Sequence, residues 1–554
     1  MDKDIYKGID KNKDKDKNES KDRIKNMVHE IHNDSVEESP DADAAWAEER
    51  RRRIRERQKR RNHQVFIYRL ILLVCVIAAV ILASMGITRI LKHNGFGKTG
   101  SDKHTSIATA ADLTASETTE APDPKTALLT SAERLAAMYD YDGAISLLQG
   151  SEYGKDSDVG AAISDYEARK GTLQPADNSK IPHVFFHTLI VDTTRALTND
   201  RLGQSFNSVM TTIPEFEAIL QQLYERGYVL VGMHDIAEIQ IQFDGTEKMV
   251  QKQIMLPEGK KPIVISEDDV NYYEYMQGHG FADKMVLDAD GKLKLQYTDA
   301  DGNVSVGDYD IVPILDQFIE EHPDFSYHGH KAIIAFTGYN GVLGYRTDET
   351  YDAASEAYDP KNTANPNIEA DRETVKTLTK ALVEDGYELA SHSWGHINFT
   401  DRSLEDLTRD TDRWQRNVAS LLPGPVDIML YPYGADIQDW HPYDAAGNQK
   451  FVMLENAGFR YFCNVDSNPY WVQFGENFVR QGRRNLDGYR LYEAYSGGTD
   501  HVSDLMDIKQ VFDTRRPTPI GWNYGSSEAA GTTPETTEAQ STASETTPSQ
   551  NTAS

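Results

Sequence analysis

The stretch "KPIVISEDDVNYYEYM" (Lys261–Met276) joins an apolar run to three consecutive acids. Its apolar run, Pro262–Ser266, is typical of a buried β-strand, and three acids follow it directly: Glu267, Asp268 and Asp269. Adjacent carboxylates repel one another, and an acid at the end of a buried strand is costly to desolvate. The stretch therefore predicts a buried sheet that carries polar chemistry at the carboxyl end of this strand.

Short apolar runs alternate with amphipathic segments on both sides of this strand. Strands are predicted at 183–191, 229–233, 262–266, 331–338, 387–393, 426–434, 460–466 and 488–494. Helices are predicted at 213–228, 312–323, 372–386 and 451–458, and polar Asp-Gly turns at 287–310 indicate inserted hairpins. Strands that alternate with helices predict an α/β fold with a parallel sheet, here with enough units to close a barrel.

Length and charge limit the possible classes of protein. The chain has 554 residues, too many for one ordinary domain, and a formal net charge of -30. An acidic chain repels phosphate backbones, so we expect no nucleic-acid partner. With only two cysteines, Cys75 and Cys463, the chain has neither a disulfide scaffold nor a cysteine-rich zinc site.

The N-terminal part predicts a membrane anchor. Residues 1–63 are polar, are expected to be a disordered cytoplasmic tail, and end in the basic run Arg50–Arg61. The uncharged run Leu70–Ile87 predicts a single transmembrane helix within 64–92. A cleaved signal peptide is the alternative, but the run is long for one and lies far from the N-terminus. The positive-inside rule then predicts a single-pass cell-membrane protein with everything after the helix outside.

The remaining segments flank the predicted barrel. Residues 93–125 are rich in Ser and Thr and are expected to form a flexible stalk. Residues 126–175 contain two apolar stripes at helical spacing, in Ser131–Glu152, and resemble one tetratricopeptide-type helical hairpin. A single repeat cannot bury its own face, so a packing or spacer role is expected. Residues 521–554 form a low-complexity tail.

Polar side chains follow several of the predicted strands. "SHSWGH" supplies His392 and His396, and Asp268 and Asp269 follow the strand described first. In a barrel these strand ends meet at one face. Two imidazoles and a carboxylate form a ligand set for a divalent metal with open positions, and a second carboxylate can act as a base. Taken singly, the histidines also fit surface or capping positions, and the acids fit a turn or a helix N-cap.

Residues 181–515 resemble the polysaccharide deacetylases of carbohydrate esterase family 4, the NodB homology domain. Ser266–Val270 corresponds to the family motif Thr/Ser-Phe-Asp-Asp-Gly, and His392–His396 to His-Ser/Thr-x-x-His. Leu430–Gly434, "LYPYG", corresponds to Arg-x-Pro-Tyr-Gly. The resemblance implies a distorted (β/α)7 barrel over 180–520, preceded by the transmembrane helix and the helical hairpin.

The resemblance also implies a reaction and the role of each residue. Asp268 matches the general base, and the backbone N–H of Tyr433 matches the oxyanion donor. The matching metal ligands are Asp269, His392 and His396, with zinc as the expected ion. The implied substrate is a polysaccharide that contains N-acetylglucosamine, from which the enzyme would remove acetyl groups.

Departures from the motifs point to one branch of the family. Leu430 stands where the family has Arg, as in the poly-N-acetylglucosamine deacetylases, in which an early histidine acts as the acid. His187 matches that position; the alternative is an ordinary core histidine. Val270 replaces the motif's Gly, and since a β-branched residue disfavours positive φ, the turn is expected to differ. Glu267 replaces Phe, and Arg346 is a candidate for the missing Arg.

Other residues and functions stay open. "DIQDW" (Asp436–Trp440) resembles the family's fourth motif but comes too early, so Asp466 and Trp471 are preferred. Aromatic residues named as candidates for stacking on sugar are Tyr272, Tyr273, Trp394 and Trp471. The rival function is a non-catalytic wall-binding or scaffold protein, and another amidase or an O-acetyl esterase would share the site.

Overall fold

The computed structural model describes residues 123–466 and 468–518. The predicted cytoplasmic tail, transmembrane helix and C-terminal tail lie outside these residues, as does the stalk except for its last three residues. Within the described ranges, no helix is long and apolar enough to cross a membrane.

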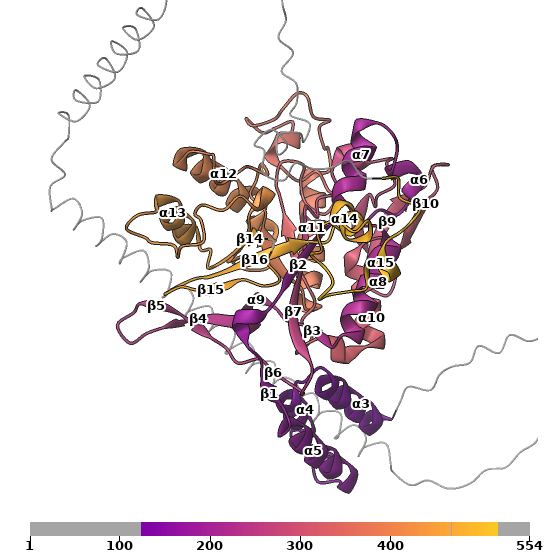
Figure 1. Cartoon of the computed structure of the whole chain (residues 1–554), viewed down its shortest axis with the longest axis vertical. Coiled ribbons are helices and arrows are strands. Elements are labelled where there is room, and N and C mark those ends of the chain that lie inside the picture. Colours follow the sequence, from indigo (N-terminus) through magenta and orange to yellow (C-terminus); the bar gives the residue numbers. More distant parts are fainter. Residues whose placement is uncertain (1–122, 467, 519–554) are drawn as a thin grey trace, which may run out of the picture. The chain divides into compact units, whose positions relative to one another are not determined.

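Seven parallel strands close into a barrel at the centre of the described chain (Figure 1). In spatial order they are β11 (Ile333–Phe336), β12 (Glu388–Ser391), β13 (Ile428–Leu430), β14 (Tyr461–Val465), β16 (Val479–Asn485), β2 (His183–His187) and β7 (Lys261–Asp268). The ring closes because β7 also pairs with β11. β3 (Tyr228–Leu230) pairs in parallel with the first residues of β7. β15 (Val472–Phe474) pairs with β16 in the antiparallel direction. The predicted (β/α)7 barrel is confirmed.

Helices cover the outside of the barrel. They are α6 (Thr193–Ala196), α7 (Arg201–Val209), α8 (Ile213–Glu225), α10 (Ile311–Glu321), α11 (Ile368–Glu384), α12 (Leu404–Asn417), α13 (Gln449–Ala457), α14 (Gly488–Tyr495) and α15 (Ile508–Val511). The short helix α9 (Met233–Ile236) instead packs with the hydrophobic cluster inside the barrel. Because strand side chains alternate, Ile263 and Ile265 of β7 join the cluster under the helices, whereas Val264 joins the cluster inside the barrel. Both faces of the strand are thus buried, which explains its continuous apolar run.

Three small antiparallel sheets lie outside the barrel sheet. β8 (Lys284–Leu287), β9 (Leu293–Thr298) and β10 (Val304–Gly307) form the hairpins predicted within 287–310. β4 (Ala237–Ile241) pairs with β5 (Glu247–Gln251), and β1 (Gln174–Pro175) pairs with β6 (Met255–Leu256).

Three helices, rather than the expected two, precede the barrel: α3 (Pro124–Ala137), α4 (Tyr141–Gln149) and α5 (Ser157–Lys170). They lie at one end of the barrel, next to β1 and β6 (Figure 1). Ala132 and Ala136 share one hydrophobic cluster with Ile333 and Ile428 of the barrel strands. These helices therefore close the end of the barrel where the strands begin.

One predicted strand is wrong. Residues 488–494 form helix α14, and the last barrel strand is β16, with the sequence "VRQGRRN". All seven residues of β16 are buried, although most of them are charged or polar. Hydrophobic alternation cannot reveal a strand whose inward and outward side chains are both polar. The misplaced strand also hid the arginines that β16 carries.

Candidate metal centre

The carboxyl ends of the strands bring the predicted site residues together. Asp268 ends β7 and lies opposite His187, the last residue of the neighbouring strand β2. Asp269 follows with a left-handed φ of 62°, whereas Val270 has no positive φ and is fully buried. Asp269 thus takes the strained conformation, and the β-branched Val270 avoids positive φ and packs in the core.

Asp269, His392 and His396 each offer a ligand atom, and these atoms lie within 4.8 Å of one another. Nδ1 of His392 donates a hydrogen bond to the carbonyl of Leu430 at 2.7 Å, which leaves the lone pair of Nε2 for a metal. Burial lowers the pKa of His396 to about 4, so this imidazole is neutral, as a metal ligand must be. Two imidazoles and a carboxylate fit a divalent cation.

A buried nitrogen of His396 also supports a bound cation at this site. Nδ1 of His396 is buried and has no hydrogen-bond partner among the described residues. An unpaired polar atom in a protein interior is uncommon and indicates a group that binds there.

A buried arginine holds the predicted base. Nη1 of Arg483, on β16, donates to Oδ1 of Asp268 at 2.7 Å, and the arginine side chain is 0% exposed. Burial opposes ionisation of Asp268, but the charge of Arg483 outweighs it, and the pKa of the carboxyl lies below its usual value. Asp268 is therefore an ionised acceptor beside the three candidate ligands, since Nε2 of His392 lies 3.8 Å from its other oxygen.

A chain of hydrogen bonds inside the barrel supports this arginine. Nη1 of Arg483 also donates to Oγ of Ser266 at 3.2 Å, and Nε2 of His183 lies 2.9 Å from the same oxygen. Nδ1 of His183 lies 3.0 Å from Oε1 of Gln481, whose amide donates to a backbone carbonyl. Since Oε1 is an acceptor, Nδ1 carries the proton, and the serine hydroxyl donates to Nε2. The orientation of the guanidinium is thus fixed from β2, β7 and β16 together.

Arg483 occupies the place for which the sequence suggested Arg346. That suggestion is wrong, because Arg346 donates to the carbonyls of Tyr272 and Asn340 at 2.7 Å and pairs with Glu274 at 3.8 Å rather than with Asp268. It fixes the loops after β7 and β11. A signal for the arginine of β16 was present in the sequence, since three arginines fall within a segment of strand length.

His187 and Tyr433 border the same centre. Nδ1 of His187 is buried without a hydrogen-bond partner among the described residues, so it is available to a ligand. Tyr433 has a φ of 58°, and its ring packs edge-on against the ring of His396, with centroids 4.4 Å apart. The turn after β13 therefore contacts the loop that carries the two candidate histidine ligands.

Comparison with known proteins adds a partial assignment. Residues 347–447 match the polysaccharide deacetylase family. This segment contains His392, His396 and Tyr433, whereas Asp268 and Asp269 lie outside it. No curated relative matches the sequence.

Three solved structures are similar at low identity. A de-N-acetylase from Aggregatibacter actinomycetemcomitans has 13% identity, covering 56% of this chain and 95% of its own, with a TM-score of 0.30. The Streptococcus pyogenes deacetylase PplD, in complex with acetate, has 12% identity over 57% and 95%, with a TM-score of 0.28. IcaB from Ammonifex degensii has 12% identity over 56% and 92%, with a TM-score of 0.27.

Glu267 does not belong to the centre. It points away from the barrel interior and is buried beside Asp310, whose carboxylate accepts a hydrogen bond from the Tyr272 hydroxyl at 2.9 Å. Burial and the neighbouring Asp310 carboxylate raise the pKa of Glu267, so the acid is held neutral. The replacement of Phe by Glu in the first motif thus alters the packing under the helices rather than the ligand set.

The other sequence candidates lie elsewhere or are buried. Tyr272 and Tyr273 are almost fully buried, which excludes direct stacking on a sugar, although the Tyr273 hydroxyl donates to Oδ1 of Asp269 at 2.6 Å. Trp471 packs over the guanidinium of Arg480, 5.0 Å from it. Asp466 accepts the N–H of Asn468 within its own turn.

Proposed function

We propose that the protein is a metal-dependent hydrolase that removes N-acetyl groups from a glycan containing N-acetylglucosamine. The observation that carries this proposal is the convergence of Asp269, His392 and His396 within 4.8 Å, beside the ionised Asp268. The match of residues 347–447 to polysaccharide deacetylases supports it. A bound divalent cation, for which we propose zinc, would polarise the acetyl carbonyl and make water more acidic.

Different residues of the site carry out the separate steps of the proposed reaction. Asp268 accepts the proton of the attacking water, because Arg483 keeps it ionised. The backbone N–H of Tyr433 donates to the oxyanion that forms at the acetyl carbon. His187 donates a proton to the leaving amine of the sugar, a step for which its unpaired Nδ1 is available.

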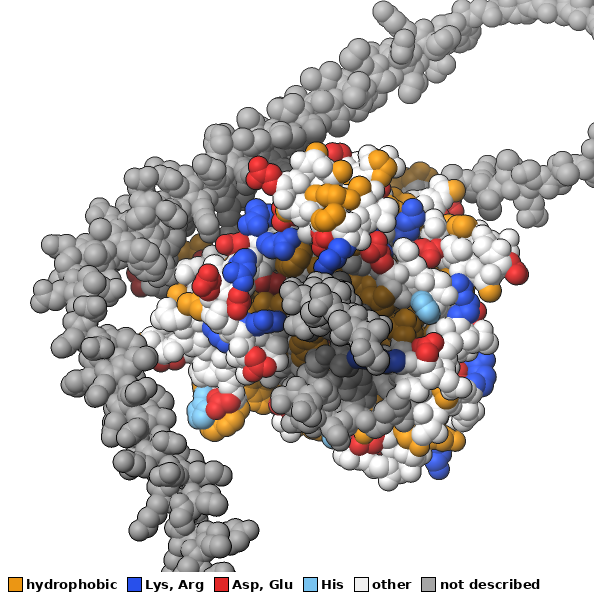
Figure 2. All heavy atoms as spheres, turned by 90° about the horizontal axis from the view of Figure 1, so that it is seen from above, with side chains coloured by type: hydrophobic (Ala, Val, Ile, Leu, Met, Phe, Trp, Pro, Cys, Tyr) orange, Lys and Arg blue, Asp and Glu red, His pale blue; other side chains and the backbone are white. Residues whose placement is uncertain are grey.

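We also propose that the enzyme acts outside the cell, on cell-wall glycan or exopolysaccharide. The uncharged run within 64–92 and the basic residues before it support a single membrane anchor with a cytoplasmic tail. On the described face opposite α3–α5, acidic and basic side chains are interspersed (Figure 2). Such a mixed surface suits a polymer that is recognised through its sugars rather than through a strong charge.

The test is acetate release from peptidoglycan, chitin oligomers and poly-N-acetylglucosamine, measured together with the metal content of the purified protein. We expect chelation and Asp269→Asn each to abolish acetate release, and Asp269→Asn to remove the bound metal. Asp288→Asn is the control, since this aspartate lies in the turn between β8 and β9, where its carboxylate accepts the N–H of Asp290. Turnover that persists without metal would refute the scheme.

The rival scaffold function predicts a different result in the same experiment. A non-catalytic wall-binding protein would bind glycan without a stoichiometric metal and would release no acetate. An O-acetyl esterase would hold the metal but would hydrolyse acetyl esters in preference to amides.

A further inference from the structure

Trp440 is the most exposed tryptophan of the described chain, with 69% of its surface open to solvent. It belongs to the segment "DIQDW", in the loop that follows the Tyr433 turn. Tryptophan carries the largest apolar surface of any side chain and is usually well buried, so the exposure of Trp440 leaves a large apolar surface in water.

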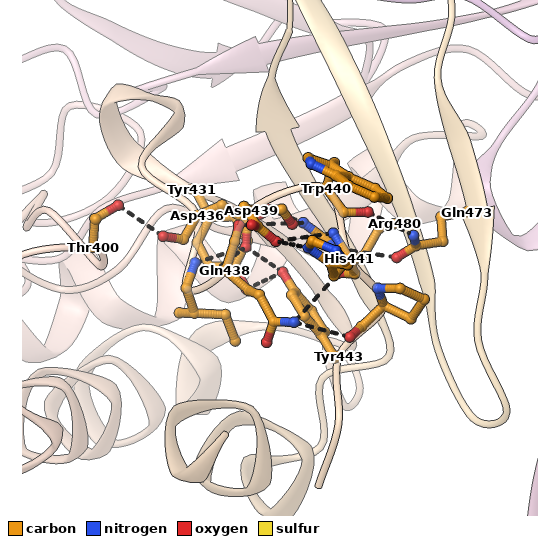
Figure 3. Close-up of polar contacts among 12 residues, drawn as sticks. Thr400, Tyr431, Asp436, Gln438, Asp439, Trp440, His441, Tyr443, Gln473 and Arg480 are labelled. Carbon is orange, nitrogen blue, oxygen red and sulfur yellow. Dashed lines mark hydrogen bonds and ion pairs between the residues drawn. The ribbon is translucent and has the colours of Figure 1, made fainter. Parts of the chain in front are cut away.

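The backbone on both sides of Trp440 is held by a buried arginine. Arg480 of β16 is 1% exposed and donates to the carbonyls of Asp439 at 2.8 Å and His441 at 2.7 Å (Figure 3). The carbonyl of Trp440 itself accepts the side-chain amide of Gln473 at 3.0 Å. Three consecutive carbonyls are therefore fixed, so little loop entropy remains to be lost when a ligand binds.

Asp436 and Tyr443 fix the guanidinium of Arg480. Nη2 of Arg480 pairs with the carboxylate of Asp436 at 2.7 Å, and its guanidinium lies over the ring of Tyr443, 4.2 Å from the centroid. Tyr443 also donates to Asp436 at 2.5 Å. Both guanidinium Nη atoms of Arg480 therefore hold the loop, through the carbonyls of Asp439 and His441 and the carboxylate of Asp436.

One face of the indole is covered and the other is open. The ring of His441 stacks on Trp440 with centroids 3.7 Å apart and planes 27° apart. Nδ1 of His441 lies 2.7 Å from the carboxylate of Asp439, which fixes the imidazole. Within the described residues no other ring stacks on Trp440, so a flat apolar surface faces solvent.

We propose that Trp440 is a subsite for a neutral pyranose ring of the glycan, distinct from the sugar whose acetamide is cleaved. This inference rests on the proposed function. A pyranose presents a flat C–H face, which packs on an indole by dispersion and by release of water. Trp440 lies seven residues after Tyr433, at most about 25 Å of extended chain, so an oligosaccharide of several sugars can reach both points. The protein therefore acts on polymers and favours longer chains.

The experiment compares short and long substrates on the full-length protein. We measure kcat/KM for acetate release from N-acetylglucosamine dimers and hexamers, in β-1,4- and β-1,6-linked form, and the Kd of each hexamer by calorimetry. We expect Trp440→Ala to lower kcat/KM for one hexamer by about 5- to 10-fold and to weaken its binding similarly, in line with the energy of one aromatic contact. Values for dimers remain unchanged, and Trp440→Tyr retains most of the affinity.

Phe243→Ala is the matched control, because Phe243 is fully exposed but lies in the β4–β5 turn. An equal effect of Trp440→Ala on dimers and hexamers, or no effect on either hexamer, overturns the subsite. The two proposals fail separately. If the wild-type protein binds a hexamer through Trp440 but releases no acetate, the proposed reaction is wrong and the subsite stands.

Discussion

Replacing Arg483 tests the electrostatics of the site most directly. The guanidinium lies 2.7 Å from the carboxylate of Asp268, and both groups are buried. Two charges about 4 Å apart at an effective dielectric constant of about 20 interact by about 4 kcal/mol, which corresponds to about 3 pKa units. In Arg483→Gln the largest charge that lowers the pKa of Asp268 is lost while the burial that raises it remains, so the carboxylate takes up its proton at higher pH. We expect the acidic limb of the kcat/KM profile to move up by about 2 to 3 pH units.

The assay is acetate release as a function of pH, accompanied by thermal unfolding at each pH. An uncompensated buried carboxylate also costs about 3 to 5 kcal/mol of unfolding free energy, so the folded fraction of Arg483→Gln must be measured. Arg483→Lys keeps the positive charge and is the second variant. We expect its acidic limb to lie near that of the wild type. A folded Arg483→Gln protein with an unshifted acidic limb would show that the arginine does not set the pKa of the base.

Three further predictions address other parts of the site. His187→Gln should lower kcat by about 10²- to 10⁴-fold without loss of metal, because the imidazole is assigned to proton transfer; metal loss would contradict that role. Burial lowers the pKa of His183 to about 3, so the unfolded chain binds the extra proton first as the pH falls below about 6.5. Measured by chemical denaturation, the free energy of unfolding should fall by about 2 kcal/mol between pH 7 and pH 5. In His183→Gln this fall should be smaller. Gly434→Ala should cost about 1 to 3 kcal/mol and slow turnover, since φ is 64° and the new Cβ would lie 2.4 Å from Val465, whereas Gly424→Ala, with open space around it, should be neutral.

The sequence predicted the parts of the fold and site whose signals are local. The apolar run before Asp268 predicted its strand, and the spacing of His392 and His396 predicted that both candidate ligands lie on one loop. The partner of the base escaped prediction because Arg483 lies on a strand without an apolar pattern. Such a strand is stable only through long-range partners, such as Ser266, that no local pattern reveals.

The first three helices also bear on how the molecule can be divided. Ala132 and Ala136 belong to the same hydrophobic cluster as the inward side chains of β11 and β13, so the helices cover the end of the barrel where the strands begin. A fragment trimmed to residue 180 would leave that end open to water and would be prone to aggregate. A recombinant fragment that contains the barrel should therefore start no later than about residue 123, where Asp123 caps helix α3.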